Sequence, residues 1–149
     1  MRVVSLVPSW TETILAAQVN VVGRTRYCIH PAGQIESIPI VGGTKDLDLE
    51  KLTQINPDLL LLDQEENPKW LSEKAPCPWQ ATHVTSALDL PRELQVLSKK
   101  LNSPQLAVIG QRWADVMRNP LPLWSASHPL PGVLEWGASL RPKLKKWSI

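Results

Sequence analysis

The stretch that decides the fold is residues 1–23, MRVVSLVPSWTETILAAQVNVVG. The apolar run over 2–7 predicts a strand that is broken at Pro8, and Ser9 or Thr11 is suited to cap a helix over about 10–18. A second short strand is predicted over 19–23. Strand, short polar turn and helix N-terminus, in this order, are the parts with which α/β proteins build ligand clefts at strand ends.

The same alternation continues along the chain. Asp48 is expected to cap a helix that ends near Ile55, and Leu59–Leu62 is predicted to form a buried parallel strand. Pro68 suits the first position of the next helix. The stretch 79–84 is the next predicted strand.

The strongest helical pattern of the chain lies over 90–101, where leucines recur every three or four residues. The stretch 105–110 is predicted as a last strand or an extended lead-out. We therefore predict an α/β fold class, a three-layer Rossmann-like lobe with a mainly parallel sheet. This lobe is assigned to residues 1–110, and residues 111–149 to an irregular, Pro- and Trp-rich basic extension.

Composition limits the possible partners. The chain has 149 residues and a net charge of +2, with a net of −2 over residues 1–110 and +4 over 111–149. The basic end has no arginine run or RNA-binding signature, so no nucleic acid is expected. Cys28 and Cys77 lack metal-ligand spacing and are interpreted as free thiols.

Two further signals bear on location. No apolar run is long enough to cross a bilayer, and no secretory signal pattern precedes the first strand. As written, the chain is expected in the cytoplasm, or in the periplasm or outside the cell if a signal has been removed.

Four segments together carry a family resemblance: SLVPSWTE (5–12), VGRTRYCIHP (22–31), PIVGGTKDLDLEKL (39–52) and PDLLLLDQEEN (57–67). Their order and spacing resemble the helical-backbone substrate-binding proteins of ABC importers, most of all the cobalamin and metal-chelate receptors. Members of that family hold a corrinoid or metal chelate between two α/β lobes joined by one long helix. The resemblance covers about residues 2–110, which implies the N-terminal lobe only.

The resemblance also implies which residues face the ligand. Tyr27 matches a loop tyrosine that packs on the corrin, and the turn after the first strand matches a loop facing the cleft. Two further loops match at the predicted strand ends. The implied ligand-binding residues are Pro8, Ser9, Trp10, Tyr27, Gly42, Gly43, Thr44, Asp63, Glu66 and Asn67. In relatives a glutamate just beyond the last loop docks on the transporter; here Lys69 and Trp70 follow, so Glu66 or Glu73 would have to substitute.

Several of these residues have a plainer alternative. Tyr27 and Trp10 have the flat apolar faces that stack on a macrocycle, but either is equally suited to ordinary packing. His30 is a weak metal candidate, and a surface loop histidine is the simpler interpretation. The carboxylates of Glu65 and Glu66 suit a helix N-terminus better than acid–base catalysis.

The predicted function is therefore noncatalytic binding of a cobalamin-like corrinoid or another metal chelate, with no intrinsic cofactor and with an ABC-transporter permease as an implied partner. No nucleophile elbow, Walker loop or dinucleotide fingerprint is present, which argues against an enzyme. One rival is a ligand-free protein-interaction or dimerisation module. The other is an enzyme on the same rim, which would depend on Glu65 or Glu66.

Overall fold

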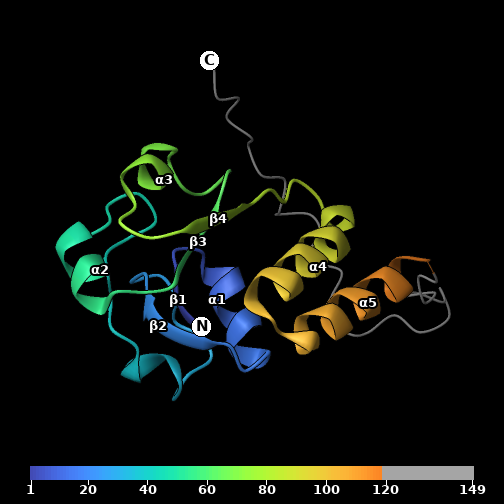
Figure 1. The fold of residues 1–149 in the computed structure, drawn as a ribbon. Helices are drawn as coiled ribbons and strands as arrows, with labels where there is room; N and C mark the ends of the chain where they lie inside the picture. The colour runs from blue at the N-terminus through green and yellow to red at the C-terminus, as the bar shows by residue number, and fades with distance from the viewer. Residues whose placement is uncertain (119–149) are drawn as a thin grey trace, which may run out of the picture. The chain divides into compact units, whose positions relative to one another are not determined.

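A four-stranded parallel sheet forms the centre of the molecule (Figure 1). The computed structural model describes residues 1–118, which form one compact unit. The strands are β1 (Arg2–Ser5), β2 (Asn20–Arg24), β3 (Leu59–Asp63) and β4 (Trp79–Thr82), in the spatial order β2-β1-β3-β4. All three neighbouring pairs are parallel, which confirms the predicted α/β class and parallel sheet.

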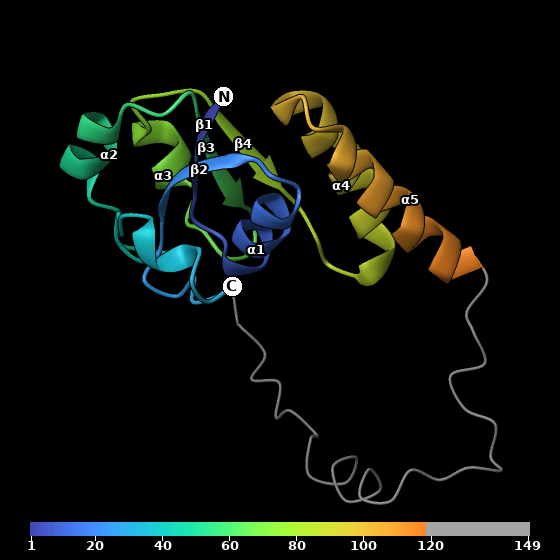
Figure 2. The ribbon, with the colours of Figure 1, turned by 90° about the horizontal axis from the view of Figure 1, so that it is seen from below.

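Helices cover both faces of this sheet and complete the three layers (Figure 2). On one face lie α1 (Pro8–Ala16) and α4 (Leu90–Leu101), and α5 (Pro104–Arg118) packs on α4. On the other face lie α2 (Leu49–Ile55) and α3 (Trp70–Lys74). Two short 3-10 helices, Ile35–Ser37 and Ala87–Asp89, lie in the connections.

The sheet divides the core into two clusters, because successive side chains of a strand point to opposite faces. Leu59 and Leu61 of β3 belong to the cluster under α1 and α4. Leu60 and Leu62 belong to the cluster under α2 and α3. All four leucines are at most 3% exposed, so the prediction of a fully buried strand is confirmed.

Two helix starts differ from expectation. The prediction that Ser9 or Thr11 caps α1 is wrong: Val7 is the N-cap residue without a side-chain bond, and Pro8 opens the helix. The Thr11 hydroxyl instead donates to the Val7 carbonyl at 2.9 Å. Helix α3 begins at Trp70, two residues after Pro68.

The cap of α2 is as predicted. Asp48 Oδ1 accepts the Lys51 N–H at 3.0 Å, and α2 ends at Ile55 with Asn56 in the left-handed conformation. This cap fixes the point at which the chain leaves the preceding loop, which contains Gly42 and Gly43.

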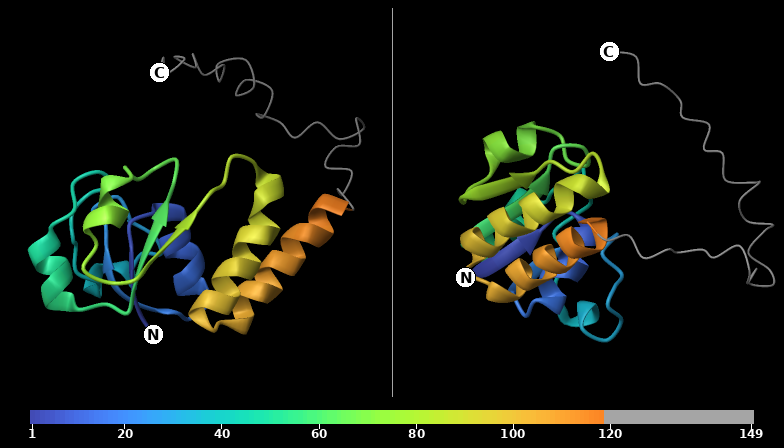
Figure 3. Two further views of the ribbon diagram at one scale, coloured as in Figure 1. Left: turned by 45° about the horizontal axis from the view of Figure 1, so that its top comes forward. Right: turned by 90° about the vertical axis from the view of Figure 1, so that its right-hand side faces the viewer.

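The end of the described chain corrects another expectation. Residues 105–110 are neither a strand nor an extended segment, because α5 runs from Pro104 to Arg118. Gly110 packs closely against α4, because a Cβ there would lie 3.0 Å from the Leu94 Cβ. The two helices lie side by side in both views of Figure 3. Gly110, the last residue of the predicted lobe, thus serves helix packing.

Two expectations concern the remaining part of the chain. Within the predicted extension over 111–149, residues 111–118 continue α5, and residues 119–149 lie outside the described residues. Among the described helices, none is at once long and apolar enough to traverse a bilayer.

Candidate functional site

The loops that leave the carboxyl ends of the strands share one edge of the sheet, because every strand runs in the same direction. Strand β1 lies between β2 and β3, so the chain reverses its direction of winding there. Ligands of open α/β sheets bind at such a switch point, beyond the carboxyl ends of the strands. We call the loops over 6–9, 25–30, 42–46 and 63–67 the rim.

Asn67 joins three of the four rim loops. Its side-chain amide donates to the Thr44 carbonyl at 2.8 Å and to the Leu6 carbonyl at 3.4 Å. Its side-chain oxygen accepts the backbone N–H of Asp63 at 2.8 Å. The residue is 7% exposed, so these bonds form away from water and fix the loops relative to one another.

Arg26 links the loop after β2 to the glycine loop. Its backbone N–H donates to the Gly42 carbonyl at 2.9 Å, and its guanidinium pairs with the Asp46 carboxylate at 2.7 Å. The hydrogen bond to Asp46 raises the pKa of Arg26 further above its ordinary value. The rim loops over 25–30 and 42–46 are therefore held together as one surface.

Cys28 fixes the loop after β2 through contacts of its side chain. Its buried thiol lies 3.2 Å from the Thr11 hydroxyl and 3.1 Å from the Thr25 hydroxyl. Thr11 belongs to α1, so this contact connects the loop after β2 with the helix after β1. With the Asn67 and Arg26 bonds, it makes the rim a continuous network.

Tyr27 is the aromatic residue that this network presents to solvent. Its side chain is 54% exposed, and its backbone N–H donates to Thr25 Oγ1 at 3.2 Å. The Arg26 guanidinium carbon lies 5.9 Å from the ring centroid, on one side of the ring. An exposed ring on a fixed loop is suited to stack on a flat ligand.

Trp10 has a different environment from Tyr27. It is 5% exposed and packs in the cluster under α1 and α4 with Ile14 and Ala17. It presents no ring face to a ligand here, so the structure favours the packing alternative. Ser9 is exposed and Pro8 is half-buried at the start of α1.

The backbone of the third rim loop requires a glycine at position 42. Gly42 has φ of +133°, and a Cβ there would clash with the Asp46 carbonyl oxygen. A Cβ on Gly43 would clash with the Asp46 carboxylate. The close neighbour of both glycines is the protein's own Asp46.

Asp63 is a structural carboxylate rather than a free ligand group. It is 5% exposed; one oxygen accepts the Glu65 N–H at 2.9 Å and the other accepts the Thr82 hydroxyl at 2.6 Å. Glu66, by contrast, points to the surface. Its partial burial, and next the charge of Asp63, raise the pKa of Glu66.

The structure also gives His83 two neighbours that sequence reasoning did not find. Its Nδ1 lies 3.0 Å from Gln64 Oε1, and its Nε2 lies 3.7 Å from Glu65 Oε1. All three side chains are exposed enough to reach solvent at the β3 and β4 ends. The signal available in the sequence was that Gln64 and Glu65 follow the predicted strand over 59–62 and that His83 lies near the end of the next one.

Metal and catalytic chemistry have little support within residues 1–118. No group of three or more potential metal ligands is found there, and His30 is an exposed loop residue. None of the hydrogen bonds described for that part of the chain joins a serine or cysteine to a histidine. A chelate that brings its own metal remains compatible with this rim.

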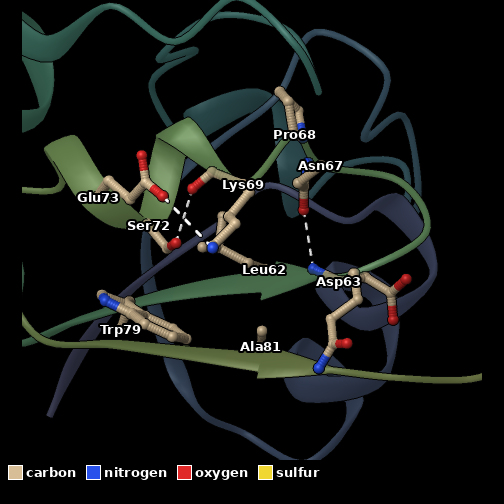
Figure 4. A pocket seen from close by; sticks show the side chains of 10 residues that line it. Leu62, Asp63, Asn67, Pro68, Lys69, Ser72, Glu73, Trp79 and Ala81 are labelled. Atoms are coloured by element: carbon tan, nitrogen blue, oxygen red, sulfur yellow. Dashed lines mark hydrogen bonds and ion pairs between the residues drawn. The ribbon is translucent and has the colours of Figure 1, made fainter.

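A cavity of about 540 Å³ opens beside the rim (Figure 4). Asp63 and Asn67 lie at its rim end, and it extends beneath α3 along β3 and β4. Its other lining residues are Leu62, Gln64, Pro68, Lys69, Ser72, Glu73, Trp79 and Ala81. No sequence pattern pointed to this cavity.

Comparison with known proteins identifies the fold. No protein-family model matches the chain, and no curated protein matches it. Solved structures do match: a periplasmic heme-binding protein from Pseudomonas aeruginosa has a TM-score of 0.67 and 23% identity over 78% of this chain and 44% of its own. The periplasmic vitamin B12-binding protein of Vibrio cholerae has a TM-score of 0.64 and 23% identity, over 80% of this chain and 48% of its own.

A third match is the apo form of a periplasmic heme-binding protein from Roseiflexus sp. RS-1. It has a TM-score of 0.64 and 26% identity, over 78% of this chain and 46% of its own. The chain thus spans less than half the length of each of these three structures. The resemblance predicted from the sequence is confirmed: this chain has the fold of one lobe of the periplasmic heme- and vitamin B12-binding proteins.

Proposed function

We propose that the rim binds a planar metal chelate, a corrinoid or a heme, without catalysing a reaction. The observation that carries this proposal is the hydrogen-bond network through Asn67, Arg26 and Cys28. It holds the rim loops in one arrangement and presents the Tyr27 ring at their surface. A preorganised surface loses less conformational entropy when a ligand binds, so more of the contact energy appears as affinity.

The matched proteins support the choice of ligand class. They are heme-binding or vitamin B12-binding proteins, and both ligands are flat macrocycles that carry a metal. Tyr27 provides a flat apolar face for such a ring. The proposal includes a periplasmic location and an ABC-transporter permease as partner, as in the family that the sequence resembles, with Glu66 or Glu73 as the docking carboxylate.

The proposed site is one wall of a binding site. Ligand pockets usually bury most of the ligand surface, and a single rim buries one side of a macrocycle. We therefore expect weak binding by this chain alone, and stronger binding if a second lobe or a second copy covers the other side.

Titration with hemin, cobinamide and cobalamin tests the proposal, with calorimetry and absorbance as independent measurements. Saturable binding of at least one chelate, with one ligand per chain, is expected. Tyr27→Ala is expected to weaken it about threefold to tenfold, the effect of one well-placed aromatic contact. Trp113→Ala, which removes an exposed aromatic residue on α5, is the matched control and should leave the affinity unchanged.

Two results would contradict parts of the proposal. The absence of heat and spectral change at millimolar chelate would exclude chelate binding by this rim. Binding that is unchanged in Tyr27→Ala would remove Tyr27 from the site.

A further inference from the structure

The cavity beneath α3 exists because that helix is too short for the strands that it covers. Helix α3 has five residues, about 7.5 Å at 1.5 Å per residue, whereas the five residues of β3 extend about 16 Å. Part of the sheet face along β3 and β4 therefore has no helix over it. Ala81, with its small side chain, leaves this part of the face hollow.

The lining of the cavity is mainly apolar. Leu62 and Ala81 form the floor on neighbouring strands, and Pro68 lies at the start of the segment above them (Figure 4). The Trp79 indole lies beside Ala81 at the far end and is 46% exposed. A volume of about 540 Å³ is within the range of about 300–1,000 Å³ that small-molecule sites occupy.

Most polar groups around the cavity already have partners within the protein. Asp63 and Asn67 bond to the rim, Gln64 bonds to His83, and the Ser72 hydroxyl donates to the Lys69 carbonyl at 2.7 Å. These groups orient the walls and leave little capacity for a ligand.

The Lys69 ammonium group has only a weak partner. Its contact with Glu73 is long, at 3.7 Å, and the side chains are 89% and 60% exposed. An exposed ion pair of this kind contributes little, so exchange of Glu73 for another anion costs little. Lys69 overhangs the mouth of the cavity, where its ammonium group can reach an anion whose apolar part lies on Leu62 and Ala81.

From these features we propose that the cavity is a second binding site, separate from the chelate rim, for a small planar aromatic molecule that carries one carboxylate or sulfonate. The aromatic rings lie on the Leu62 and Ala81 floor against the Trp79 indole, and the anionic group pairs with Lys69. Trp79 contributes an offset or edge-to-face aromatic contact, and Lys69 contributes the charge selectivity.

The test uses the full chain and the fluorescent probe 1-anilinonaphthalene-8-sulfonate. The proposal predicts saturable binding of one probe per chain with enhanced fluorescence. Naphthalene-1-sulfonate should compete more strongly than the neutral 1-naphthalenemethanol. Near-ultraviolet circular dichroism of each variant shows whether its tertiary packing is intact, since this probe also binds partly folded states.

Three variants assign the site. Lys69→Met keeps most of the length of the side chain without its charge and should weaken probe binding about threefold to fivefold, the scale of one exposed ion pair. Ala81→Leu fills the floor and should reduce the affinity at least tenfold in a folded chain. Lys74→Met, at the C-terminal end of α3 and away from the lining, is the matched control and should have no effect.

The outcomes separate this site from the rim. Tyr27→Ala should leave probe affinity unchanged, and cobinamide should not compete with the probe. The proposal is overturned if the probe does not bind, if Ala81→Leu and Lys69→Met bind it as tightly as the unmodified chain, or if the neutral competitor is as effective as the sulfonate. Competition by cobinamide would instead assign probe binding to the rim.

Discussion

The two faces of the sheet are covered by helices of different length. Helices α1 and α4, of nine and twelve residues, cover one face, and α5 packs behind α4. Helices α2 and α3, of seven and five residues, cover the other. We call these the long-helix face and the short-helix face. The cavity of about 540 Å³ lies on the short-helix face, although the same β3 strand contributes leucines to both faces.

The difference shows how one strand sequence can support both stability and binding. Four consecutive leucines supply each face with two side chains, so the strand itself does not distinguish the faces. The helix above each face decides whether that surface is fully covered. The predictions below test this comparison, beginning with the largest expected effect.

The largest effect is expected from shortening a leucine on the long-helix face. Leu61→Ala should lower the free energy of unfolding by about 3–5 kcal/mol, because it opens a void in a closed cluster. Leu62→Ala, on the floor of the existing cavity, should cost about 2–3 kcal/mol, since that side is already open. Urea unfolding followed by circular dichroism measures both; equal costs would contradict the difference between the faces.

Removal of the Asn67 side chain is expected to have the next largest effect. Asn67→Ala leaves the Asp63 N–H and the Thr44 carbonyl without their partner, and a buried polar group left unpaired costs about 1–3 kcal/mol. Faster amide exchange over 42–46 and 63–67 should accompany the loss. Asn20→Ala, at an exposed position, is the control. Unchanged exchange in both loops would show that Asn67 does not hold the rim together.

Filling the cavity should stabilise the short-helix face. Ala81→Leu adds apolar contacts where the lining is open, and such filling commonly gains about 0.5–2 kcal/mol. Thermal unfolding measures the gain, and Ala114→Leu on the half-buried surface of α5 is a control for a general effect of added leucine. A loss of stability with an intact fold would mean that the floor of the cavity is already well packed.

The smallest effect concerns pH. Burial, and next the charge of Asp63, raise the folded-state pKa of Glu66 above the ordinary 4.5, so the folded chain binds this proton more tightly than the unfolded chain. Stability should therefore increase as pH falls through the raised pKa towards 4.5. Glu66→Gln should be more stable at pH 7 by less than about 1 kcal/mol, given solvent screening, and the gain should vanish near pH 3. A gain equal at both pH values, or shared by Glu36→Gln, would contradict this origin.

Much of the fold was predictable because its signals are local. The leucine spacing over 90–101 predicts α4, and Asp48 predicts the start of α2, since both patterns depend on residues within one or two turns. The α5 helix was missed because Gly110 and the nearby Pro104 are usual signs of an ending. Here Pro104 begins the helix, and Gly110 allows close contact with Leu94, which is a tertiary feature.

The position of the rim loops was predictable, but the hydrogen-bond roles of their residues were not. The loops were placed correctly at the strand ends, whereas Asp63 and Asn67 turned out to bond to the protein itself. Trp10 and Tyr27 could not be distinguished by residue type. The spacing of Trp10, Ile14 and Ala17 on one helix face was the available signal for burial, and Tyr27 has no such periodic neighbours.

The most direct test of the central claim is to map chelate binding residue by residue. Cobinamide added to the nitrogen-15-labelled chain should shift amide resonances over 6–9, 25–30, 42–46 and 63–67, with the largest changes next to Tyr27. Resonances of α2, and of α5 on the long-helix face, should not move. Shifts confined to those helices, or no shifts at millimolar cobinamide and hemin, would contradict the assignment of the rim as a chelate-binding surface.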